Sequence, residues 1–348
     1  MNSNTDARFM LRAIELARKA EGYTAPNPLV GCVIVHEGRI IGEGYHRAYG
    51  EPHAEVNAIA SVLDSTILKE STLYVTLEPC AHFGKTPPCS NLIIEKGIPK
   101  VVVGCRDPFE AVNGKGIEQL RRAGVEVITD FMLEECRHVN RRFFTFHEKK
   151  RPYVLLKWAQ SSDGFMDIDR SEPTKGSFMI SHPDTQALVH AWRAEEAAIL
   201  IGKNTLLNDN PSLTVRRVTG KNPIRIVLSA NPIDLSGYHL SDSQATTWVI
   251  TNEHSRVEGS IRHLACGNVH SIERVLNCLY EQGVLSVMVE GGAQILHAFL
   301  ESGLWDEARV IHADKELGNG LPAPGVHEPC TKEEVSASDR IRYYYKQS

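Results

Sequence analysis

Apolar positions in the first 148 residues recur with the periods of helices and of strands. Spacings of three to four residues predict helices over 5–21, 53–63, 90–97, 116–124 and 132–147. Short apolar runs predict strands over 30–35, 39–45, 72–77, 100–105 and 125–129, of which the first two form a β-hairpin. A hairpin followed by β–α units is typical of a three-layer α/β domain.

The same alternation returns after a break. Residues 147–151 form the charged run HEKKR, Pro152 follows, and a new apolar strand begins. We therefore predict two α/β domains, 1–148 and 149–348. In the second domain the pattern predicts strands over 153–159, 197–202, 224–229, 246–251, 285–290 and 308–313, and helices over 184–196, 271–283 and 293–303.

Composition and charge narrow the class of protein. The chain has 348 residues, of which 42% are hydrophobic and 23% charged, as in ordinary globular proteins. No run approaches the roughly 18 apolar residues that span a bilayer, and the N-terminus has no signal-peptide core, so we expect a cytoplasmic protein without a membrane partner. The net charge is −5, with 19 acidic and 19 basic residues in 1–150 and hence 24 and 19 beyond. Without a basic excess, we expect no nucleic-acid partner.

Four residues of the first domain predict a catalytic metal site. His53 and Glu55 lie at the start of the predicted helix 53–63, and Cys80 and Cys89 flank eight residues of a loop rich in Gly and Pro. One imidazole and two thiolates suit Zn²⁺, and three protein ligands leave its fourth position open for water. Glu55 has the chemistry to carry the proton of that water. The order His-x-Glu, then Pro-Cys and a second Cys, is that of zinc deaminases, whose two Cys are separated by only two residues.

Simpler interpretations stay open at this point. His53 and Glu55 also fit a capped helix with one acid in its first turn, and Cys80 and Cys89 also fit buried thiols. A structural zinc with a fourth side-chain ligand would instead make the domain a binding module without turnover. The combination of all four residues within a strand–loop–helix pattern favours the catalytic zinc.

Three stretches of the first domain resemble the deaminase half of the bifunctional enzymes of riboflavin biosynthesis. They read APNPLVG at 25–31, HAE at 53–55 and PCAHFGKTPPC at 79–89. The second domain is similar to the reductase half in KWAQSSDG at 157–164, RAEEAAILIGKNTLLNDNPSLTVR at 193–216 and VEGGAQIL at 289–296. The resemblance covers nearly the whole chain. It implies a cytidine-deaminase-like domain followed by a dihydrofolate-reductase-like domain.

In the deaminase half the resemblance implies a diaminopyrimidine that carries a ribose 5-phosphate as the substrate. It places Asn27 and His46 on the pyrimidine, and His82 and Lys85 on the ribose phosphate. An ammonium and an imidazole are suitable partners for a phosphate dianion. The residues also fit simpler roles, Asn27 in a turn between two prolines, His46 at a strand end, and the other two at a polar loop tip.

In the reductase half the resemblance implies NADPH, which reduces the ribosyl to a ribityl chain, and a homo-oligomer, a dimer or tetramer. The residues implied for the cofactor are Ala159, Thr205, Asp209, Gly292, Ala293, Gln294, Ile295, Leu296, His297 and Ala298. Those implied for the substrate are Ser177, Arg193, Leu213, Arg216 and Glu290. Gly291 and Gly292 between a strand and a helix fit a phosphate cradle, but they fit a tight turn as well. Arg193 also fits a solvated helix face and Leu213 a core position.

Alternative functions remain at the level of the sequence. A cytidine or tRNA-adenosine deaminase with an unrelated second domain is one, although the eight-residue spacing between Cys80 and Cys89 and the lack of basic excess oppose it. A reductase domain kept only for assembly is another. Asn210 stands where the family more often has Asp, and Asp314 where it tends to have Pro, so we expect the reductase half to depart more from the family pattern than the deaminase half.

Overall fold

The computed structural model describes residues 3–81, 87–109, 112–170, 178–253 and 255–347. The chain forms two compact units, Met1–Lys149 and Lys150–Ser348. The sequence predicts the domain boundary between residues 148 and 149. Each unit is an α/β fold with its own hydrophobic core.

The first unit is built on a five-stranded sheet with the strand order β2-β1-β3-β4-β5. Its strands are β1 (Gly31–His36), β2 (Arg39–Tyr45), β3 (Thr72–Leu77), β4 (Lys100–Cys105) and β5 (Glu126–Ile128). β1 runs antiparallel to β2 and β3, whereas β3, β4 and β5 are parallel. This is the predicted hairpin followed by β–α units.

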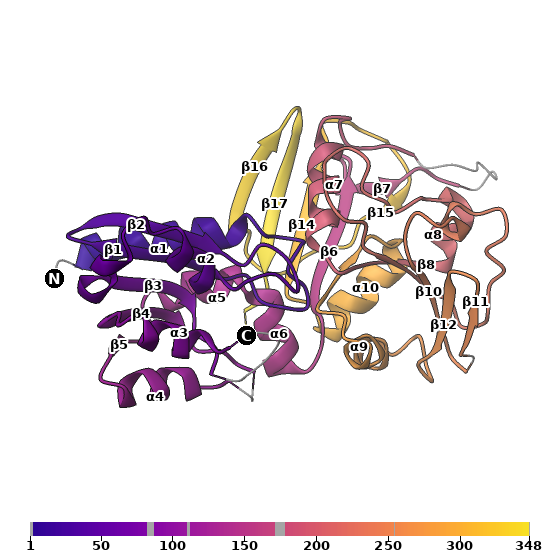
Figure 1. The fold of residues 1–348 in the computed structure, drawn as a ribbon. Coiled ribbons are helices and arrows are strands. Elements are labelled where there is room, and N and C mark those ends of the chain that lie inside the picture. The colour runs from indigo at the N-terminus through magenta and orange to yellow at the C-terminus, as the bar shows by residue number, and fades with distance from the viewer. Residues whose placement is uncertain (1–2, 82–86, 110–111, 171–177, 254, 348) are drawn as a thin grey trace. The chain divides into compact units, whose positions relative to one another are not determined.

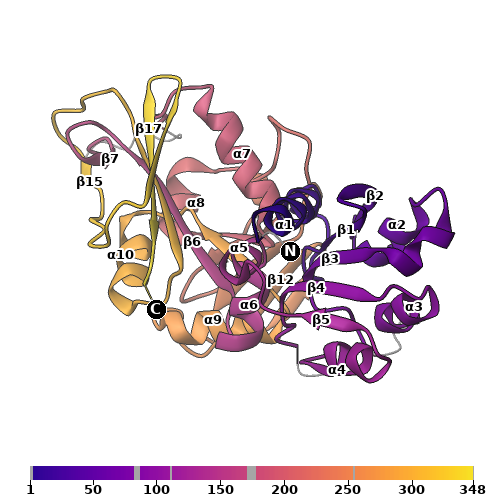
Figure 2. The same ribbon diagram turned by 90° about the vertical axis from the view of Figure 1, so that its left-hand side faces the viewer.

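Helices cover both faces of this sheet, which confirms the predicted three layers (Figures 1 and 2). One apolar cluster joins the sheet to α1 (Ser3–Arg18), α5 (Leu133–Val139) and α6 (Arg141–Lys149). A second cluster joins the other face to α2 (Ala54–Ala60), η1 (Ser65–Glu70), α3 (Cys89–Glu95) and α4 (Lys115–Arg122). The residues that predict zinc lie at the ends of elements on this second face.

A glycine in the hairpin sets the position of α2. A Cβ atom on Gly44 would lie 2.3 Å from the backbone nitrogen of Ala58 and 2.5 Å from the carbonyl oxygen of Ala54. Only a residue without a side chain therefore lets the α2 backbone rest directly on β2. The close approach fixes the height of the α2 N-terminus, where His53 stands.

The second unit is built on a ten-stranded sheet with the order β11-β12-β10-β9-β8-β13-β6-β14-β17-β16. Its strands are β6 (Tyr153–Gln160), β8 (Ala198–Gly202), β9 (Ile224–Leu228), β10 (Thr247–Thr251), β11 (Arg256–Glu258), β12 (Ile261–Ala265), β13 (Ser286–Val289), β14 (Glu307–His312), β16 (Lys332–Ser336) and β17 (Asp339–Tyr345). The run from β12 to β14 is parallel, and β11, β17 and β16 add antiparallel edges. A separate pair, β7 (Phe165–Asp167) with β15 (Leu321–Pro322), is antiparallel.

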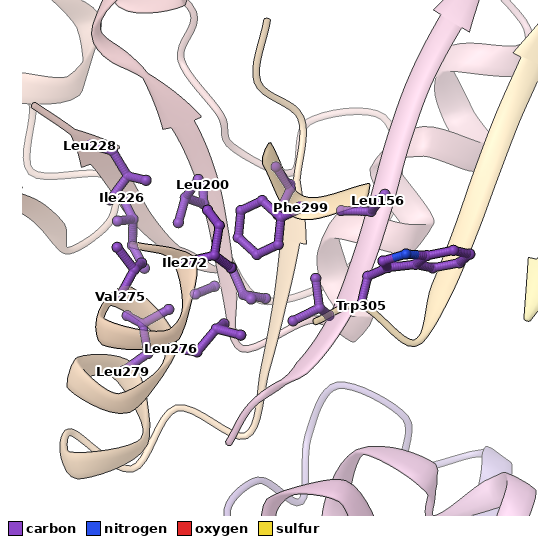
Figure 3. Packing of buried hydrophobic residues seen from close by; sticks show 14 of the residues in the cluster. Leu156, Leu200, Ile226, Leu228, Ile272, Val275, Leu276, Leu279, Phe299 and Trp305 are labelled. Carbon is purple, nitrogen blue, oxygen red and sulfur yellow. The ribbon is translucent and has the colours of Figure 1, made fainter. Parts of the chain in front are cut away.

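Helices also cover both faces of the large sheet. α7 (Thr185–Glu195) and α8 (Lys203–Asp209) contribute to one apolar cluster, and α9 (Ile272–Glu281) and α10 (Ala293–Ser302) to the other. Figure 3 shows Phe299 of α10 between Leu200 of β8 and Leu156 of β6. Because β6, β8 and β13 are adjacent and parallel, their carboxyl ends share one edge, from which α8 and α10 begin. Ligands of open α/β sheets bind at such edges.

One predicted helix is wrong in its extent. The stretch 132–147 forms two helices, α5 and α6, which are separated at Asn140. The Asn140 side chain accepts a hydrogen bond from the Leu29 backbone N–H (2.7 Å) and donates one to the Leu29 carbonyl (2.8 Å). This long-range pairing ties the break to the segment before β1, and no local period reveals it.

Several short elements escaped the apolar pattern, namely η1, β7, α8, η2 (His239–Ser241), β11, β12, β15, β16 and β17. In β17 the buried Ile341 and Tyr343 alternate with Arg340 and Arg342. Alternation of this kind is typical of a half-buried strand, but it contains none of the continuous apolar runs from which the other strands were predicted.

Candidate active sites

The metal-ligand candidates of the first unit meet in one cluster. The ligand atoms of His53, Cys80 and Cys89 all lie within 4.8 Å of one another. His53 Nδ1 lies 3.3 Å from Cys89 Sγ and 3.6 Å from Cys80 Sγ, so a single ring nitrogen faces both sulfurs. His53 is the N-cap of α2, and its side chain makes no capping hydrogen bond, which leaves the ring directed at the thiols. The capped-helix interpretation therefore does not account for His53.

The chain around the two cysteines supports thiolate chemistry. Cys80 follows β3, and Cys89 opens α3 and donates its backbone N–H to Cys80 Sγ (3.3 Å). Ser90 holds the Cys80 carbonyl with its backbone N–H and with its hydroxyl. The hydrogen bond from the Cys89 thiol, aided by His53, holds the pKa of Cys80 well below its ordinary value against the effect of burial. One nitrogen and two sulfurs at this separation are a donor set that fits zinc.

Glu55 lies beside these ligands, in the first turn of α2. The residue is 3% exposed. Burial, and then the charge of Cys80, raises its pKa to about 7. A carboxyl group with a pKa near the working pH can both accept and release a proton. The buried acid thus has the protonation behaviour that a proton carrier needs.

Two further predicted residues come together next to His53. The His46 ring lies 5.5 Å from the His53 ring in a T-shaped arrangement. His46 Nδ1 lies 3.1 Å from the Pro52 carbonyl oxygen, which only accepts, so this nitrogen carries the proton. Nε2 then accepts from the Asn27 amide (3.0 Å), and burial lowers the pKa of His46, in agreement with a neutral ring. His82 and Lys85 lie outside the described residues.

The buried acid Glu78, which was not among the predicted site residues, supports the chain segment that leads to Cys80. Glu78 is 4% exposed and stands two residues before Cys80. Its carboxylate accepts four backbone hydrogen bonds, from Asp107 (3.3 Å), Gly114 (2.9 Å), Gly116 (3.0 Å) and Ile117 (3.2 Å). An acidic residue directly before Pro79 was the available sequence signal for this role. The sequence does not show its hydrogen-bond partners, because they lie in the distant segment 107–117.

In the second unit a buried ion pair joins two predicted substrate residues. Arg193 of α7 donates from Nε (3.0 Å) and Nη2 (2.7 Å) to the two oxygens of Glu290, which follows β13. Lys157 of β6 lies 3.8 Å from the same carboxylate. Burial opposes the charged form of Glu290, but the charges of Arg193 and Lys157 outweigh it and lower its pKa to about 2. Lys157, a charged residue on the apolar strand β6, was not among the predicted site residues.

The remaining substrate candidates lie on the segment that follows α8. Leu213 is 2% exposed and packs in the core, whereas Arg216 is exposed and donates to Thr214 Oγ1 (2.6 Å). Arg193 also donates to the Thr214 carbonyl oxygen (3.4 Å), which links this segment to the ion pair. Ser177 lies outside the described residues.

The cofactor candidates concentrate where α8 and α10 begin. The Gly292 backbone N–H donates to Thr205 Oγ1 (2.9 Å), and a Cβ on Gly202 would lie 2.7 Å from Ile295 Cδ1. The two turns therefore pack closely, and the N-terminus of α10 offers N–H groups and a positive dipole end to a phosphate. This arrangement fits a dinucleotide phosphate.

The other cofactor candidates lie on β6, at the end of α8 and along α10. Ala159 is on neighbouring β6, and Asp209 is the last residue of α8, where it accepts from Arg170 (3.1 Å). Within α10, Ala293, Gln294, Ile295, His297 and Ala298 follow the turn, and Leu296 is fully buried in the apolar cluster.

Comparison with known proteins agrees with both units. Residues 3–105 match the cytidine and deoxycytidylate deaminase zinc-binding region, and residues 152–334 match the RibD C-terminal domain. The riboflavin biosynthesis protein RibD of Aquifex aeolicus is 42% identical over 91% of this chain and 89% of its own length. The Escherichia coli RibD protein is 36% identical over 90% and 89%.

Two solved structures share the fold of the whole chain. One is a diaminohydroxyphosphoribosylaminopyrimidine deaminase/5-amino-6-(5-phosphoribosylamino)uracil reductase from Thermotoga maritima, 38% identical, with a TM-score of 0.89 and full coverage of both chains. The other is RibD of Acinetobacter baumannii, 31% identical, with a TM-score of 0.89 over 99% of this chain and 100% of that one.

Fold and site together define a zinc-dependent deaminase joined to an NADPH-dependent reductase. The chain belongs to the RibD family of bifunctional riboflavin biosynthesis proteins. The match in both halves rules out the alternative of a nucleoside or tRNA deaminase with an unrelated second domain. No helix within the described ranges is long and apolar enough to cross a bilayer.

Proposed function

We propose that residues 1–148 deaminate 2,5-diamino-6-ribosylamino-4(3H)-pyrimidinone 5′-phosphate and that residues 149–348 reduce the ribosyl chain of the product to ribityl. The observation that carries the deaminase is the convergence of His53, Cys80 and Cys89 beside the buried Glu55. The reaction named for the Thermotoga maritima relative supports the choice of substrate.

In the deaminase, His53, Cys80 and Cys89 would hold zinc, which when bound supplies the Lewis acidity that makes water a nucleophile near neutral pH. The Glu55 carboxylate takes a proton from the attacking water. The same carboxyl delivers this proton to the ring nitrogen. It then takes the second proton from the new hydroxyl on the ring carbon and gives it to the amino group, which leaves as ammonia as the carbonyl forms. Neutral His46 and Asn27 orient the pyrimidine, while His82 and Lys85 bind the ribose phosphate.

In the reductase, Thr205, Ala159, Asp209 and the stretch 292–298 would hold NADPH, which when bound supplies the reducing equivalent. Arg216 and Arg193 provide positive charge for the substrate phosphate. Glu290, kept ionised by Arg193 and Lys157, accepts hydrogen bonds from substrate hydroxyl groups. Ser177 completes the substrate contacts, and Leu213 anchors the segment that carries Arg216 to the core.

The proposal also covers the cellular location and the oligomeric state of the enzyme. We infer a cytoplasmic homo-oligomer, a dimer or tetramer, from the family resemblance. Light scattering coupled to size-exclusion chromatography measures the mass directly. A monomer at micromolar concentration would contradict this inference.

The coupled reaction tests both activities at once. The diaminopyrimidine ribotide and NADPH are added to the purified zinc-loaded protein, and absorbance at the NADPH band is followed together with ammonia release. We expect ammonia first and then loss of NADPH, because only the deaminated ribotide is the reductase substrate. Ammonia without NADPH loss would refute the reductase assignment, and the absence of both would refute the deaminase assignment.

A further inference from the structure

A buried histidine beside the reductase ion pair has no role in the function proposed so far. His190 lies on α7, one turn before Arg193, and is 3% exposed. Its Nδ1 accepts a hydrogen bond from the backbone N–H of Arg216, with a distance of 3.0 Å. The ring therefore connects the helix that carries one substrate arginine to the backbone of the other.

This hydrogen bond determines the form of the ring. An N–H donor requires a lone pair on Nδ1, so the ring is neutral and its proton is on Nε2. The surroundings favour the same form, because burial and the positive charges of Arg193, Arg216 and Arg217 lower the pKa of His190 to about 4, against the weaker opposite effect of Glu290. A cationic ring would lose the bond and meet three arginines.

The segment that His190 holds does not rest in its preferred backbone conformation. Leu213 adopts a left-handed backbone angle (φ 52°), which a non-glycine residue keeps only where its surroundings impose it, whereas Asn210 (φ 41°) is an ordinary left-handed cap at the end of α8. Thr214 and Val215 are held by Arg193 and by the Asn222 side chain (2.7 Å). His190 provides the next fixed point, at Arg216 itself.

We propose that His190 is a positioning residue of the reductase, a neutral imidazole whose Nδ1 holds the Arg216 backbone so that the guanidinium meets the substrate phosphate. This inference rests on the proposed function of the second unit. The Arg216 side chain is exposed and donates to Thr214 Oγ1, a residue of the same short segment. The backbone of that segment therefore determines the position of the positively charged Arg216 guanidinium.

Two substitutions of His190 distinguish the effect of losing the hydrogen-bond acceptor from the effect of losing the volume of the ring. His190→Phe fills the space but leaves the Arg216 N–H without its acceptor, whereas His190→Asn restores an acceptor at the Nδ1 position through its amide oxygen. Steady-state NADPH oxidation is measured with the deaminated ribotide as substrate. We expect His190→Phe to raise the KM for the ribotide by about 10-fold with a smaller change in kcat. His190→Asn should return within about threefold of the parent.

The controls use the intact zinc-loaded protein. Ammonia release from the diaminopyrimidine ribotide should be equal in all three proteins, since the deaminase lies in the other unit. An unchanged KM in His190→Phe, or equal impairment in the two variants, would overturn the proposal. If His190→Phe fails to fold, His190→Gln takes its place, because its longer side chain reaches the Nε2 position instead. If the parent protein itself does not oxidise NADPH, the reductase function is refuted. That result differs from the two outcomes that would overturn the role of His190.

Discussion

Arg193 and Glu290 form a bidentate ion pair across 97 residues of chain, with both carboxylate oxygens within 3.0 Å of the guanidinium. Both side chains are nearly buried, and Lys157 approaches the same carboxylate. The pair thus brings α7, β6 and the end of β13 to one place at the ligand edge of the sheet. Its energetics and its function can be tested separately.

Removal of one partner should destabilise the second unit. Glu290→Gln leaves Arg193 buried without its counter-charge, and we expect the free energy of unfolding to fall by about 3 kcal/mol. All four tryptophans of the chain lie beyond residue 150, so tryptophan fluorescence during urea unfolding reports this unit alone. The double variant Arg193→Met with Glu290→Gln is the matched control, and its loss should be smaller than the losses of the two single variants added together. A loss in the double variant as large as the sum of the single losses would contradict the pairing.

The same carboxylate makes stability depend on pH. Its pKa is lowered from 4.5 to about 2, so the folded state favours the ionised form. The stabilisation is present above pH 4.5 and is lost as the pH falls from 4.5 towards 2. We expect the tryptophan-monitored free energy of unfolding to fall over this window in the parent. The fall should be shallower in Glu290→Gln, and equal slopes would exclude Glu290 as the titrating group.

Glu55→Gln should separate zinc binding from proton transfer. The amide has nearly the same shape but cannot accept the proton of water, so ammonia release should fall by at least about 100-fold. Zinc content, measured by elemental analysis, should stay equal to that of the parent. Reduction of the deaminated ribotide should also be unchanged. Ammonia release at the parent rate would show that another group carries the proton.

Glu78→Gln should weaken the metal site without touching a ligand. An amide NH₂ would face backbone N–H groups that now donate to the Glu78 carboxylate, and the turn that presents Cys80 would shift. We expect zinc affinity, measured by competition with a chromogenic chelator, to fall by about 10-fold. The control is Glu118→Gln on α4, an exposed acid paired with Arg122, which should leave the affinity unchanged. Equal affinities in all three proteins would limit Glu78 to a role in folding.

Much of the architecture could be predicted because the helices bury one face and the central strands, such as β4 and β10, are continuous apolar runs. The strand β17 alternates buried and charged residues, so it contains no such run and was missed. The break at Asn140 depended on a side chain that bonds the backbone of Leu29, a contact that spacing does not encode.

The sequence by itself determined which residues to propose as metal donors and as proton carrier, because His53, Glu55, Cys80 and Cys89 are chemically specific and stand at element boundaries that periodicity reveals. Only the tertiary structure decided how these groups are supported. Glu78 gains its four N–H donors, His190 its Arg216 backbone and Arg193 its Glu290 from segments distant in the chain. These partners are brought together only by the fold. A buried polar group without a hydrogen-bond partner costs free energy, so the folded chain favours the arrangement in which these groups are paired.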